Sequence, residues 1–166
     1  FYDSTYNFQG YQIFQIKDAT VNSGDVYNPD KARLVAQVDI RDSIARLVNF
    51  PFNKALGGTV PQEMVNGADK GIKHSFRITE DMFAQGDKRL VNHKTYYYMA
   101  IAYAYNQFKP YAQDIAPQPS NPFFAASDGQ TIPYFAGRKN IRQTVGTPHI
   151  PVVESGGLIA NSVYGQ

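Results

Sequence analysis

Groups that could carry acid–base, nucleophilic or metal chemistry are few and scattered in this sequence of 166 residues. The histidines, His74, His93 and His149, lie far apart and lack the HxxxH spacing that brings two ligands to one zinc ion. No serine lies in a GxSxG turn, and no glycine-rich phosphate loop occurs. Cysteine is absent, which excludes disulfides and thiolate chemistry. We therefore expect no catalytic residues, no metal site and no enzyme.

Carboxylates remain as candidates, because a glycosidase needs only two of them. Glu80 and Asp81 are adjacent, and Asp39 and Asp42 flank an expected turn. A surface cap for the following turn explains Glu80 better than a catalytic acid does.

Calcium is the one cofactor that the loops could hold. Oxygen ligands from loops bind calcium in extracellular modules, and Asp18, Asp25, Asp30 and Asp128 lie in expected loops. Their spacing lacks the dense DxDxDG pattern, so simple solvated loops are favoured and no cofactor is predicted.

Aromatic side chains in loops could instead stack on sugar rings, and Tyr27, Tyr111 and Tyr134 are the candidates. Tryptophan, the usual best platform, is absent. A net charge of +2 and short basic pairs such as Lys88-Arg89 give no reason to expect nucleic acid. No stretch approaches the length of a membrane-spanning helix, so no membrane insertion is expected.

The elements that must position these side chains are predicted to be strands. Aromatic residues, all Tyr and Phe, make up 14% of the chain, a bias that favours strands over helices. Strands are expected over residues 8–17, 32–40, 44–52, 74–79, 95–105 and 138–145. A hairpin is expected at Asn66-Gly67 and one short helical turn at 80–86. Several short strands separated by turns indicate an all-β sandwich or barrel.

Residues 90–98 resemble the turn into the sixth strand of fibronectin type III domains. Leu90, Asn92, Lys94 and Tyr96 follow one another in steps of two, as that family's turn residues do. The resemblance implies a structural corner formed by Leu90, Asn92 and Tyr96. Leu90 would fill the core beneath the turn, and the Tyr96 hydroxyl would bond back to the backbone.

Gly10-Tyr11, followed by alternating apolar residues, is similar to the family's third strand, and residues 74–79 would be the fifth. The resemblance implies an immunoglobulin-like sandwich over residues 1–147, with insertions at about 41–73 and 107–137 and a linker to a following domain at 148–166. The family's first two strands and its core Trp have no counterpart here. We expect those strands to lie upstream or to come from another chain; the alternative is a different β fold.

Strand alternation divides the side chains between two faces. If Tyr96 points inward, so do Tyr98, Ala100 and Ala102, and Tyr11, Ile13 and Gln15 on the neighbouring strand share their face. The opposite face then carries a predicted docking surface: Phe14, Ile16, Tyr97, Met99, Ile101 and Tyr103.

A monomer rarely leaves so large an apolar patch in water. Either the chain's own insertions cover it, which is the favoured interpretation, or a partner protein does. The available covering side chains are Phe50, Phe52, Phe108, Tyr111, Phe123, Phe124, Tyr134 and Phe135.

The sequence of these segments most resembles fibronectin-like modules of very large bacterial proteins exported by the type IX secretion route. This resemblance implies an extracellular or cell-surface location. The leading hypothesis is a non-catalytic structural or interaction module that docks on neighbouring domains or on another surface protein, or acts in adhesion. One alternative is a carbohydrate-binding accessory domain of a secreted glycosidase, and another is an enzyme fragment whose catalytic groups lie elsewhere.

Overall fold

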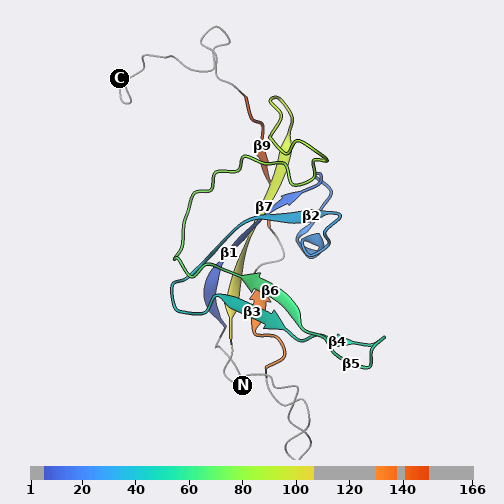
Figure 1. The fold of residues 1–166 in the computed structure, drawn as a ribbon, viewed down its shortest axis with the longest axis vertical. Coiled ribbons are helices and arrows are strands. Elements are labelled where there is room, and N and C mark those ends of the chain that lie inside the picture. Colours follow the sequence, from blue (N-terminus) through green and yellow to red (C-terminus); the bar gives the residue numbers. More distant parts are fainter. Residues whose placement is uncertain (1–5, 107–129, 138–140, 150–166) are drawn as a thin grey trace, which may run out of the picture.

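The computed structural model describes residues 6–106, 130–137 and 141–149, and this part of the chain is built from antiparallel β-strands (Figure 1). Its one helical element is a single 3-10 turn, η1 (Ser23–Asp25), capped by the Asn22 side chain. The prediction of an all-β protein is confirmed.

The main sheet has the strand order β2-β1-β7-β8, with β9 pairing the other end of β7. Its strands are β1 (Asn7–Ile16), β2 (Ala32–Asp39), β7 (Tyr96–Tyr105), β8 (Tyr134–Ala136) and β9 (Thr144–Gly146). The central pair, β1 and β7, is antiparallel from Asn7↔Tyr105 to Ile16↔Tyr97, with one register shift between Phe8 and Gly10. The prediction that these two strands are neighbours is therefore confirmed.

The predicted insertion at residues 41–73 contains two small ribbons. β3 (Arg46–Asn49) pairs with β6 (Gln62–Asn66), and β4 (Phe52–Asn53) pairs with β5 (Gly58–Thr59). The turn between β4 and β5 contains Gly57 at a φ of +64°, where a residue without Cβ avoids strain. The hairpin expected at Asn66-Gly67 is wrong, because β6 ends there and the Gly67 amide donates to the Ala45 carbonyl at 2.7 Å.

Two further expectations about local structure need correction. Residues 74–79 alternate in sequence as a strand does, but they form no strand, and no segment among the described residues supplies ladder hydrogen bonds to them. Residues 80–86 form a turn, with the Ala84 amide donating to the Asp81 carbonyl, and not a helical segment. β8 falls in a region where the sequence showed little periodicity, so no strand was expected there.

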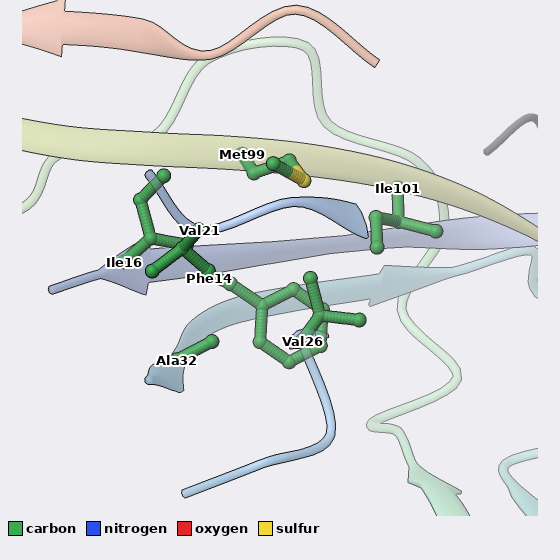
Figure 2. Close-up of a cluster of buried hydrophobic side chains, with 7 residues drawn as sticks. All are labelled: Phe14, Ile16, Val21, Val26, Ala32, Met99 and Ile101. Carbon is green, nitrogen blue, oxygen red and sulfur yellow. The ribbon is translucent and has the colours of Figure 1, made fainter. Parts of the chain in front are cut away.

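The core lies on one face of the main sheet and has two parts. Figure 2 shows the first, in which side chains from β1, β2, β7 and the loop after β1 point toward one another: Phe14, Ile16, Val21, Val26, Ala32, Met99 and Ile101. The second part joins the β3–β6 ribbon to the sheet through Leu47, Val65, Tyr103 and Tyr134. The loop at residues 17–31 and the β3–β6 ribbon are thus the covers of this face, which we call the covered face.

Candidate functional site

The predicted docking surface is the covered face. The chain's own segments cover it, as the favoured interpretation expected, so it is not an exposed docking surface. Phe14, Ile16, Met99, Ile101 and Tyr103 are each at most 5% exposed, and Tyr97 is half-buried. The physical reason is that the chain's own loop and ribbon remove these large apolar groups from water. The five buried residues hold the fold together and are not accessible to a partner.

The covering side chains differ from those expected. Val21, Val26, Leu47 and Val65 do most of the covering, and their aliphatic character gave no special signal in the sequence. Among the expected aromatic covers, Tyr134 is buried and Phe50 is half-buried. Phe52 and Phe135 are exposed, by 65% and 56% respectively. Phe108, Tyr111, Phe123 and Phe124 lie outside the described residues.

A hydrogen-bonded polar cluster lies within the covered face around Gln12. The Gln12 amide donates to the Gln37 side chain at 3.0 Å and to the Met64 carbonyl at 2.8 Å. The Tyr134 hydroxyl donates to Gln12 Oε1 at 2.9 Å and meets the Tyr27 hydroxyl at 2.6 Å. Burial raises the pKa of Tyr134, so its hydroxyl remains a donor. The cluster links β1, β2, β6 and β8, and reasoning from the sequence missed it.

Gly10 explains part of the Gly-Tyr motif. A Cβ on this residue would collide with the Val38 carbonyl and lie 2.6 Å from the Tyr103 hydroxyl. The missing side chain therefore makes room for the ring of Tyr103, which is 1% exposed. The motif is a packing requirement of the covered face and carries no chemistry.

The predicted corner precedes β7. Tyr96 is buried, and its hydroxyl accepts a hydrogen bond from the Val91 amide at 2.9 Å, as expected of a bond back to the backbone. Leu90 is half-buried and Asn92 is exposed, so Leu90 is less of a core plug than expected. His93 is exposed and adopts a φ of +63°, and its amide donates to the Pro148 carbonyl at 2.8 Å.

Asp81 ties this corner to the main sheet. Its carboxylate accepts from Gln15 Nε2 at 2.7 Å and from Lys94 Nζ at 2.8 Å, while the Met82 amide donates back to Gln15 at 2.7 Å. Burial alone would raise the pKa of Asp81, but the hydrogen bonds from Lys94, Gln15 and the Phe83 amide together hold it below its ordinary value. Its neighbour Glu80 is exposed.

Asp39 and Asp42, the other carboxylates considered, serve the loops beside β2. Buried Asp39 accepts from the Asp69 amide at 3.0 Å, and Asp69 accepts from the amides of Asp42 and Ser43. The Asp42 carboxylate in turn accepts from Gln9 Nε2. Every one of these carboxylates has main-chain or amide partners, an arrangement that orders loops.

Three of the four possible calcium ligands line one hollow of about 410 Å³ beside the 17–31 loop. Asp18 accepts from the Thr20 amide and hydroxyl, and Asp25 forms an ion pair with Lys31 at 2.8 Å. Lys31 thus supplies positive charge where a cation would sit. Asp128 lies outside the described residues.

Within the described ranges, no three His, Cys, Asp or Glu side chains gather as a metal site would require. His74, His93 and His149 are all exposed. In the same part of the chain, no helix is long and apolar enough to cross a membrane.

The opposite face of the main sheet, which we call the open face, is only partly covered. It carries Tyr11, Ile13, Tyr98, Ala100 and Ala102, the set predicted to point into the core. Ala100 is exposed and the other four are half-buried. Segment 81–94 covers only the end of this face near Gln15 and Tyr96. The prediction that these side chains share a face holds, but in the described structure that face is not a closed core.

Comparison with known proteins adds no relative to this geometry. No protein-family model matches the chain. No curated protein and no solved structure matches it either.

Proposed function

We propose that this chain is a non-catalytic structural and interaction module, a fibronectin type III-like sandwich layer within a larger secreted or cell-surface bacterial protein of the type IX cargo kind. The observation that carries the proposal is the unequal cover of the main sheet. One face is sealed by the chain's own segments, while Ile13, Ala100 and Ala102 stay accessible on the other. A half-buried apolar sheet face is stabilised by a second layer, and docking supplies one.

Two details of the structure support the sandwich assignment. β1 and β7 are central neighbours, with β2 on one side and β8 and β9 on the other. The Tyr96 hydroxyl pins the turn before β7 through the Val91 amide. Both features are what the resemblance implies for its third and sixth strands.

The carbohydrate-binding alternative loses support from the candidate aromatic residues. Tyr134 is buried and hydrogen-bonded, so it offers no ring to a sugar. Tyr27 remains 42% exposed, but Tyr111 lies outside the described residues. Of the three candidates, Tyr27 is therefore the one that the described residues leave exposed.

Hydrogen exchange of the isolated chain and of the longer parent protein tests the proposal. Amides of β1 and β7 near Ile13 and Ala100 should exchange more slowly in the parent protein, because a docked layer raises the cost of local opening. Equal exchange in both would contradict the docking role. Retention of the isolated chain on a polysaccharide affinity gel, with no change of exchange in the parent, would support the carbohydrate-binding alternative instead.

A further inference from the structure

Residues 70–78 are a connection whose main chain has no hydrogen-bond partner among the described residues. Gly71 adopts a φ of +90°, the chain bends at His74, and residues 75–78 follow this bend. Figure 1 draws the stretch between β6 and β7 without a strand arrow. Its first main-chain bond comes at Thr79, whose carbonyl accepts from the Leu90 amide at 3.3 Å. Polar main-chain groups in folded proteins normally pair, so a stretch like this one has free bonding capacity.

From Ser75 to Thr79 the side chains alternate between exposed and half-buried, as they do in a strand. Phe76 and Ile78 are half-buried, whereas Ser75, Arg77 and Thr79 are exposed. One side of the segment therefore already packs on the protein and the other faces solvent. Residues 75–79 lack a strand neighbour among the described residues, and an exposed strand edge is a template for pairing with another chain.

The segment is also basic. Lys70, Lys73 and Arg77 are exposed, and no Asp or Glu occurs from residue 70 to residue 79. None of these three cations belongs to an ion pair of the described structure. This concentration of one sign of charge selects a partner of the opposite sign.

We propose that residues 72–79 form the receiving edge for a β-strand donated by a partner protein, an extended segment in which acidic side chains alternate with apolar ones. Its main chain bonds to the free amides and carbonyls of residues 72–78. Its acidic side chains lie beside Lys73 and Arg77, and its apolar side chains point the same way as Phe76 and Ile78. This inference rests on the proposed docking function and names the partner's chemistry.

A second copy of the chain is a poorer occupant of this edge. Antiparallel pairing of two copies of residues 72–79 would set basic side chains of one copy near those of the other. Like charges facing each other across a strand pair are destabilising. Charge therefore favours an acidic strand over self-association.

The test measures amide exchange of the full chain by NMR with a capped octapeptide of alternating Glu and Val. A matched peptide of alternating Lys and Val is the control. We expect the Glu–Val peptide to slow exchange in residues 72–79 by at least about tenfold, and less so at high salt. Equal protection by both peptides, protection of the outer edge of β2 instead, or no protection at all would overturn the inference. Protection that grows with protein concentration without peptide would identify a second copy as the occupant and would also overturn it.

A charge-reversed protein sharpens the result. Lys73→Glu with Arg77→Glu changes exposed side chains only, so the exchange of β1 and β7 should stay unchanged, and preference should pass to the Lys–Val peptide. The control pair Lys54→Glu with Arg142→Glu, also exposed and outside the segment, should keep the original preference. An unaltered preference in the first variant would count against the proposed edge. Peptide failure combined with slower exchange at Ile13 and Ala100 in the parent protein would reject this inference and leave the proposed function standing.

Discussion

The covered and open faces of the main sheet are made by the same strands but have different environments. On β1 and β7, Phe14 and Ile101 belong to the covered face and are buried, whereas their chain neighbours Ile13 and Ala100 belong to the open face. Hydrogen bonding within the sheet is common to both faces. The difference therefore comes from the segments that pack on one side only, the 17–31 loop and the β3–β6 ribbon.

Side-chain size explains which face the chain covers. The covered face of β7 carries Met99, Ile101 and Tyr103, while the open face carries Tyr98, Ala100 and Ala102. Burying the larger set removes more apolar area from water, at about 25 cal/mol per Å². The comparison teaches that, given two apolar faces, the inserted segments seal the one with more to gain.

Truncating one isoleucine on each face gives the largest expected contrast. Ile101→Ala should lower the free energy of unfolding by about 2–5 kcal/mol, because it opens a cavity in the covered face. Ile13→Ala, the matched change on the open face, should cost about 1 kcal/mol, since a half-buried side chain loses less transfer free energy. Urea unfolding of both variants measures this, and equal losses would show that the open face is buried in solution.

The polar cluster of the covered face predicts the next largest effect. Tyr134→Phe removes the donor to Gln12 Oε1 and leaves that buried oxygen unsatisfied, which should cost about 1–3 kcal/mol. Tyr27→Phe is the control, because this more exposed ring loses only its bond to the Tyr134 hydroxyl. Thermal unfolding of the two variants separates them. A larger loss of stability for Tyr27→Phe would contradict the described hydrogen bonds from Tyr27 to Tyr134 and from Tyr134 to Gln12.

The corner beside the open face predicts a smaller loss. Tyr96→Phe leaves the Val91 amide without its acceptor, which should cost about 1 kcal/mol or somewhat more. Tyr98→Phe is a suitable control, since within the described residues the Tyr98 hydroxyl has no hydrogen bond. An unfolding midpoint in urea that is unchanged for Tyr96→Phe would count against the corner assignment.

Asp81, at the end of the open face where segment 81–94 packs, predicts a pH dependence of the stability. Its folded-state pKa is held below the unfolded value, so its stabilisation is present at neutral pH and is lost as the pH falls below about 4. Asp81→Asn should therefore flatten the fall in unfolding temperature between about pH 5 and about pH 3. The control is Asp30→Asn, because the Asp30 carboxylate accepts no hydrogen bond in the described structure. A similar flattening in both variants would exclude a special role for Asp81.

The sequence identified the elements that carry their own signal. The dense run of Tyr, Met, Ile and Ala at 95–105 predicted β7, and the aromatic and β-branched residues at 8–17 predicted β1. The corner bond of Tyr96 to the Val91 amide was implied by the resemblance of residues 90–98 to the fibronectin type III turn. These features are local, so a short window of sequence contains the information that specifies them.

Features that depend on distant neighbours were missed or misjudged. Residues 74–79 have a strand pattern, but pairing is a property of two segments, and the part of the chain that the structure describes offers no second one. β8 is short, and its place is set by β7 together with Asn49, which bonds both the amide and the carbonyl of Tyr134. The cluster around Gln12 draws on four strands, so no spacing along the chain could reveal it.

Alternation along the chain alone determined that Phe14, Met99 and Tyr103 belong to one side of the sheet and Ile13, Ala100 and Ala102 to the other, because successive side chains of a strand point opposite ways. Only the tertiary structure decided which side became the interior. That choice depends on where the 17–31 loop and the β3–β6 ribbon pack. Alternation with a period of two does not specify which face is buried. That face is decided only when a separate segment of the chain excludes water from it.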